Sequence, residues 1–163
     1  MFRNVNGFAK FIATAFGAGY MPVAPGTAGT AVAVPIAWAL AGLPCWQFAI
    51  FTVLVTALAI WAADTADRAW GTHDCQKIVI DEVAGYLVTM LAVDKHSWVA
   101  LLAGFVIFRI LDSTKPWPVR WLERNLPGGW GVVLDDVGAG VQGAVLMWLL
   151  AHFGVLAAIA RLG

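Results

Sequence analysis

Two pairs of adjacent carboxylates stand out in a chain that carries little charge. Asp81 and Glu82 lie in the stretch "IVIDEVAG", and Asp135 and Asp136 lie in "GVVLDDVGAG". An ionised side chain at the centre of a membrane helix costs about 2.5 to 3.5 kcal/mol, so clustered acids need a counter-charge. Mg²⁺ prefers hard oxygen ligands of this kind, and we predict that it binds all four residues. The alternative is a solvated loop with helix-capping acids, which suits Asp135 and Asp136 if a helix starts there.

The spacing around these acids predicts how they are arranged. Consecutive residues of a helix do not face each other, so the two acids of one pair are not expected to chelate one ion together. Gly85 follows Asp81 by about one helical turn, and Gly140 follows Asp136 in the same way. Small residues at this spacing let helices approach closely. We therefore expect the two acidic pairs to meet across a helix contact.

Basic residues surround another acid in "FRILDSTKPWP". Arg109 precedes Asp112 by about one helical turn, and Lys115 follows where prolines end the helix. Two cations beside a carboxylate fit the stabilisation of a phosphoryl group during its transfer. The alternative is a snorkelling arginine followed by a lysine at the membrane edge.

A glycine-rich segment, "GAGYMPVAPGTAGT", precedes an apolar helix. Its glycines can turn backbone N–H groups inward, and Thr27 and Thr30 add hydroxyls near the expected helix start. This combination suits a phosphate site at a helix N-terminus. The segment is not a P-loop, because no Gly-Lys-Ser/Thr follows at the required spacing. A plain re-entrant turn is the alternative.

The composition indicates what kind of protein positions these residues. The 163 residues are 61% hydrophobic and only 12% charged, with a mean hydropathy of +0.79. Soluble domains are closer to 45–50% apolar and 25% charged, so we predict an all-α integral membrane protein of one domain, residues 1–163. The formal net charge is zero, which argues against a nucleic acid partner. The two cysteines indicate neither a disulfide framework nor a zinc site.

Hydrophobic patterning predicts four to five short or membrane-spanning helices after an N-terminal amphipathic helix that lies on the membrane surface. The apolar segments are residues 29–41, 45–63, 78–93, 98–111 and 137–159. The second and the last are the clear spans, since about 20 apolar residues cross a hydrocarbon core of ~30 Å. Alternating crossings place eight of the ten basic residues on one side of the membrane. By the positive-inside rule this side is cytoplasmic.

The four motifs together, "GAGYMPVAPGTAGT", "HD" followed by "IVIDEVAG", "FRILDSTKPWP" and "GGWGVVLDDVGAG", resemble the phosphatidylglycerophosphatase A family in type and order. The resemblance implies a bacterial inner-membrane, Mg²⁺-dependent phosphatase. Its substrate would be a phospholipid, phosphatidylglycerophosphate, and its products phosphatidylglycerol and inorganic phosphate. The active site is then expected on the cytoplasmic side.

Carried over to this sequence, the resemblance places the acidic pairs and the basic motif in the active site. The expected catalytic residues are Asp81, Glu82, Arg109, Asp112 and Lys115. The expected phosphate-binding residues are Gly26, Thr27, Thr30, Arg109 and Lys115. The expected Mg²⁺ ligands are Asp81, Glu82, Asp135 and Asp136.

Two functions of other classes remain as alternatives. The first is a small cation or proton transporter whose carboxylates line a path. Against it, every acid except Asp94 falls on one side of the predicted topology. The second is a non-catalytic assembly subunit, which explains the glycine-rich helices but not the acids spread over three segments.

Overall fold

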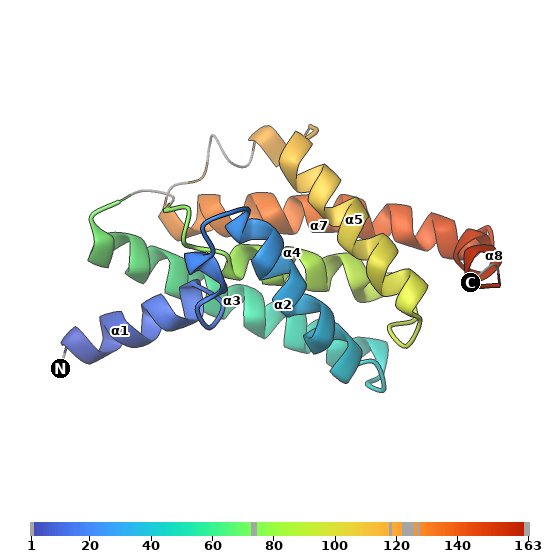
Figure 1. The fold of residues 1–163 in the computed structure, drawn as a ribbon, viewed down its shortest axis with the longest axis horizontal. Helices are drawn as coiled ribbons and strands as arrows, with labels where there is room; N and C mark the ends of the chain where they lie inside the picture. Colours follow the sequence, from blue (N-terminus) through green and yellow to red (C-terminus); the bar gives the residue numbers. More distant parts are fainter. Residues whose placement is uncertain (1, 73–74, 118, 122–125, 127, 162–163) are drawn as a thin grey trace.

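The computed structural model describes residues 2–72, 75–117, 119–121, 126 and 128–161. All regular structure in these residues is helical, which confirms the predicted all-α class. Figure 1 shows an elongated bundle with the two termini at opposite ends. The elements are α1 (Phe2–Ala13), η1 (Ala18–Tyr20), α2 (Pro25–Ala39), α3 (Cys45–Trp70), α4 (Ile80–Thr89), η2 (Met90–Ala92), α5 (Trp98–Thr114), α7 (Gly128–His152) and α8 (Val155–Ala160).

Two of these helices, α3 and α7, are long and apolar enough to cross a membrane. They contain 26 and 25 residues, and about 20 residues suffice for a span. On α3 the side chains of Ile50, Val53 and Leu54 are 52%, 67% and 63% exposed. A continuous apolar surface of this kind is typical of a face that contacts lipid or another apolar partner. The predicted span at residues 45–63 is therefore a helix, and it continues to Trp70.

The last predicted span, residues 137–159, has the wrong boundaries. Helix α7 begins nine residues earlier, at Gly128, and ends at His152. Gly154 then adopts a left-handed conformation with φ of 72°, and the separate helix α8 follows. Glycine allows the early start, since a Cβ on Gly129 would lie 2.5 Å from the Ile60 carbonyl oxygen of α3. Asp135 and Asp136 are thus well inside a helix, and the helix-capping interpretation of these acids is wrong.

The remaining helices are shorter than a full span. Helix α4 has 10 residues, so it is about 15 Å long, and every residue in it except Glu82 is buried. The predicted segment 78–93 is therefore not one continuous helix: the α-helix ends at Thr89 and the tighter turn η2 follows. Helices α2 and α5 have 15 and 17 residues. They cover the central α4 together with α3 and α7.

The predicted contact between the acidic segments is present where α4 crosses α7. A Cβ on Gly85 would lie 2.6 Å from the Asp136 carbonyl oxygen, and a Cβ on Gly140 would collide with the backbone of Gly85. The Thr89 hydroxyl donates to the carbonyl oxygens of Gly85 (3.1 Å) and Gly140 (3.4 Å) across the same crossing. The two backbones therefore touch, and this contact fixes the separation of the acids they carry.

The bundle has two distinct ends (Figure 1). The starts of α2, α4 and α7 and the end of α3 gather at one end, together with the C-terminal end of α5. The turn between α2 and α3, the start of α5, and α8 lie at the other. Helix α1 packs on α3. Its residues Ala9, Ile12 and Ala13 are buried, while Phe8 and Phe11 are exposed. Its predicted position on the membrane surface stays a prediction.

Candidate active site

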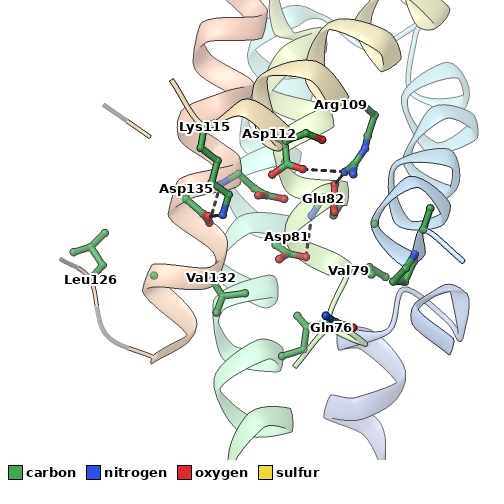
Figure 2. Close-up of a pocket in the computed structure, with 17 residues that line it drawn as sticks. Gln76, Val79, Asp81, Glu82, Arg109, Asp112, Lys115, Leu126, Val132 and Asp135 are labelled. Carbon is green, nitrogen blue, oxygen red and sulfur yellow. Dashed lines mark hydrogen bonds and ion pairs between the residues drawn. The ribbon is translucent and has the colours of Figure 1, made fainter. Parts of the chain in front are cut away.

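The acids and bases singled out in the sequence line one open cavity of about 520 Å³. Most of the lining residues come from the starts of α2 and α4, the end of α5 and the N-terminal half of α7 (Figure 2). These helix ends lie at one end of the bundle (Figure 1). The charged lining residues of the cavity are Asp81, Glu82, Arg109, Asp112, Lys115, Asp135 and Asp136. The structure thus brings together all of the predicted catalytic residues and metal ligands.

Arg109 binds two carboxylates from two helices (Figure 2). Its guanidinium pairs with Glu82 of α4 and, at 3.1 Å from Nη1 to Oδ2, with Asp112 one turn further along α5. Glu82 also accepts a hydrogen bond from the Thr30 hydroxyl at 3.2 Å. Helices α2, α4 and α5 are therefore tied together at the cavity wall by one polar network.

Lys115 forms the second ion pair, with 2.6 Å between Nζ and Asp135 Oδ2 of α7. The residue ends α5 in a left-handed conformation with φ of 43°, which is uncommon without glycine. Pro116 follows and cannot continue the helix. The strained turn directs Lys115 back over the cavity, so it is part of how the site is built.

The two remaining acids, Asp81 and Asp136, have no basic partner in the described part of the chain. Both residues are buried, at 9% and 4% exposure. Asp81 Oδ1 accepts from the backbone N–H of Glu82 at 3.0 Å, and Asp136 Oδ2 is buried without a hydrogen-bond partner. Each acidic pair is therefore divided: one member binds a basic side chain, and its neighbour does not.

This division is relevant to the predicted Mg²⁺ site. The described lining has five carboxylates and two basic side chains, an excess of three negative charges when all are ionised. A buried carboxylate oxygen without a partner is costly, and a cation would satisfy it. The donor chemistry therefore fits Mg²⁺, with Asp81 and Asp136 as the acids still available to it. Within the described residues, however, no three Asp, Glu, His or Cys side chains already converge as a metal site.

Only the middle of the glycine-rich segment lines the cavity. Ala24, Pro25 and Gly26 line the wall, and Ala24 is left-handed with φ of 49° where α2 begins. Thr27 is exposed and is not part of the lining. The Thr30 hydroxyl, predicted to bind phosphate, contacts Glu82 and the Gly26 carbonyl oxygen instead.

Gly26 is in tight contact with this network, which leads to a prediction. A Cβ at this position would collide with the Glu82 carboxylate and lie 3.2 Å from Arg109 Nη1. A carboxylate is a mobile group that can move aside, so Gly26→Ala should fold but lose the Glu82–Arg109 geometry. We expect kcat/KM to fall about 10- to 100-fold without a matching loss of thermal stability. Gly42→Ala is the control, because nothing lies within 4 Å of a Cβ there. Equal activities of the two variants would contradict the prediction.

Two polar lining residues were not predicted. Gln76 precedes the first acidic motif, and Ser113 lies between Asp112 and Lys115. Ser113 belongs to the motif "FRILDSTKPWP", so its position next to Asp112 could have indicated that it lines the site. Gln76 lies in a loop without periodicity, and no signal in the sequence marks it. The "HD" motif, residues 73–74, lies outside the described residues.

An acidic and basic cavity at one end of an apolar helical bundle defines a class of protein: a small helical enzyme that handles a charged ligand at an apolar surface. The chain matches the family model described as Phosphatidylglycerophosphatase A over residues 11–151. It belongs to the phosphatidylglycerophosphatase A family and is a phosphatase. The resemblance inferred from the four motifs is thereby confirmed.

Three curated relatives are similar over most of their length. Phosphatidylglycerophosphatase A of Escherichia coli K12 is 38% identical over 86% of this chain and 82% of its own. The Haemophilus influenzae protein of the same name is 34% identical over 87% and 88%. A Bacteroides thetaiotaomicron protein named "Putative phosphatidylinositol-3-phosphatase" is 42% identical over 83% and 89%. No solved structure matches the chain. None of the matches supports the transporter alternative.

Proposed function

We propose that this phosphatase removes the terminal phosphate of phosphatidylglycerophosphate and yields phosphatidylglycerol and inorganic phosphate. Family membership and the names of two relatives support this substrate. The observation that carries the proposal is the cavity in which acids from α4, α5 and α7 meet Arg109 and Lys115. The substrate itself would be reached from the lipid bilayer.

The charges of the cavity support a requirement for a bound cation. A phosphomonoester carries about −1.5 to −2 charges at pH 7, and five carboxylates would repel it. We propose that Asp81 and Asp136 hold Mg²⁺, whereas Glu82 and Asp135 mainly position Arg109 and Lys115. When bound, Mg²⁺ supplies charge neutralisation at the phosphate and lowers the pKa of a coordinated water.

The protein's own groups then bind and orient the phosphate. Arg109 has several N–H donors, and the pairs with Glu82 and Asp112 involve only Nη1, so other donors are available for phosphate oxygens. Lys115 and the first-turn N–H group of α2 at Gly26, which lines the cavity, complete the set. The oxygen of a water bonds to phosphorus while the bond between phosphorus and the glycerol oxygen breaks. A cavity carboxylate accepts the proton of the attacking water, and the leaving glycerol oxygen takes up a proton to become the hydroxyl group of phosphatidylglycerol.

The direct test is phosphate release from phosphatidylglycerophosphate in detergent by the purified protein. Phosphatidylinositol 3-phosphate is included because one relative carries the name of a phosphatase for that lipid. We expect phosphatidylglycerophosphate to have the higher kcat/KM of the two lipids. Preferential turnover of the inositol lipid, or release from neither, would contradict the proposed substrate.

We also propose that the chain crosses the bacterial inner membrane several times, with the cavity on the cytoplasmic side. Two observations support this topology. Helices α3 and α7 are long and apolar enough to cross a membrane, and the turns between helices lie at two opposite ends of the bundle. The prediction is that Thr114→Cys, near the cavity, reacts with a membrane-impermeant maleimide only in inverted vesicles. Native Cys45, exposed at the opposite end, should react only in intact spheroplasts. Each is tested with the other cysteines removed, and labelling of both from one side would overturn the topology.

A further inference from the structure

A second cavity, of about 530 Å³, lies next to the first and is not used by the proposed reaction. The two share Pro25 and Gln76 in their walls, so they are adjacent. The remaining wall comes from the turn around η1 and from the segment between α3 and α4: Gly19, Tyr20, Met21, Pro22, Thr72, Cys75 and Lys77. The cavity therefore extends from the acidic site along the surface of the bundle.

Lys77 supplies the basic group of this second cavity. Its Nζ lies 5.7 Å from the centre of the Tyr20 ring and 5.9 Å from that of Trp70. It makes no ion pair with a carboxylate in the described residues. Two aromatic faces thus orient an ammonium group whose charge no acid of the described residues neutralises.

The backbone that carries Lys77 is firmly held. Buried Asp67 of α3 accepts hydrogen bonds from Thr72 Oγ1 (3.0 Å) and from the Cys75 N–H (3.1 Å). The Val79 N–H donates to the Ala13 carbonyl oxygen of α1 at 2.9 Å. Gly19 packs against the Lys77 carbonyl group so closely that a Cβ there would collide with it. Lys77 is therefore presented by a fixed segment and not by a free loop.

We propose that this second cavity binds the diester phosphate that joins the lipid to its head group, with Lys77 as its basic contact. The inference rests on the proposed function. The two phosphates of phosphatidylglycerophosphate are attached to one glycerol, so a ligand with its terminal phosphate in the acidic cavity needs a second anion site next to it. Lys77 fits that single negative charge, and Met21, an exposed residue of the same cavity wall, suits the start of the apolar lipid portion.

The test compares Lys77→Met with Lys10→Met, a matched control. Lys10 also lies over the Trp70 ring, at 5.0 Å, but does not line either cavity. For Lys77→Met we expect KM for phosphatidylglycerophosphate and the inhibition constant of phosphatidylglycerol to rise about tenfold together. The inhibition constant of inorganic phosphate, which lacks the diester, should stay the same. Lys77→Arg should restore most of the lipid affinity.

Three outcomes would overturn the inference. These are an unchanged inhibition constant for phosphatidylglycerol, an equal change for inorganic phosphate, and an equal effect of Lys10→Met. A readout without turnover keeps the test separate from the proposed function: in a Cys45→Ser background, phosphatidylglycerol should slow the modification of Cys75 in the second cavity. This protection should be lost in Lys77→Met. If the wild type releases no phosphate but shows the protection, the proposed reaction fails and the lipid site stands.

Discussion

Replacement of Asp81 by asparagine should lower kcat/KM for phosphatidylglycerophosphate at least about 100-fold, the lower range for loss of one group on which transition-state charge stabilisation depends. Asparagine keeps the size of the side chain and its oxygen, which can still accept from the Glu82 N–H. It removes the negative charge that we assign to Mg²⁺. Thermal stability without metal should not fall, because the change removes a buried carboxylate that has no basic partner in the described chain.

Asp94→Asn is the matched control for this prediction. Asp94 is an exposed acid near the start of α5, at the opposite end of the bundle from the cavity. Hydrogen bonds from His96 hold the pKa of Asp94 below its usual value, so this substitution also removes a full charge at neutral pH. We expect near wild-type turnover. Similar losses in both variants would point to a general electrostatic effect, and near wild-type activity of Asp81→Asn would remove the carboxylate from the mechanism.

Asp136→Asn provides a second, independent position for the same role. The residue lies inside α7, so its effect cannot be that of a lost helix cap. We expect a loss comparable to that of Asp81→Asn. If only one of the two variants is impaired, the assignment of both acids to one cation is wrong.

The second large effect is expected from removal of divalent cations. EDTA should abolish phosphate release, and excess Mg²⁺ should restore it. The physical reason is that the described cavity lining, with all its groups ionised, has an excess of three negative charges, which opposes the entry of a phosphomonoester. Activity is measured as phosphate release before and after the addition of Mg²⁺.

A stability measurement separates metal binding from an effect of EDTA on the substrate. A ligand that binds only the folded protein raises its thermal midpoint. Mg²⁺ should therefore stabilise the wild type, and it should stabilise Asp81→Asn and Asp136→Asn less. Full turnover in EDTA, or equal stabilisation of all three proteins, would contradict a metal site formed by these two acids.

The parts of the site that follow local rules were predictable from the sequence. The spacing of Asp81 and Gly85 is a property of one helix, and so is that of Asp136 and Gly140. Their meeting at the crossing of α4 and α7 was expected for that reason, and the structure contains it. The separation of adjacent acids also follows from helix geometry, since Glu82 pairs with Arg109 while Asp81 has no such partner.

The parts that depend on tertiary structure were not predictable. The pairing of Lys115 with Asp135 requires a left-handed turn at a lysine, which no local preference favours. The early start of α7 at Gly128 depends on packing against Ile60 of α3, and a glycine pair in isolation favours a loop. The binding of Thr30 to Glu82 joins residues 52 positions apart. The sequence predicts that these residues belong to a phosphate site, but it does not predict which group each of them contacts.

The crossing of α4 and α7 makes catalysis sensitive to residues that never touch the substrate. Because Gly85 and Gly140 bring the two backbones into contact, the helices have no room to absorb an added methyl group by small adjustments of side chains. Any enlargement there must push the helices apart, and the helices carry Asp81 and Asp136 with them. In a survey of random variants these two glycines would score as essential as the acids themselves. Their importance is geometric: they determine the distance between the two helices, and therefore between the two acids of the active site.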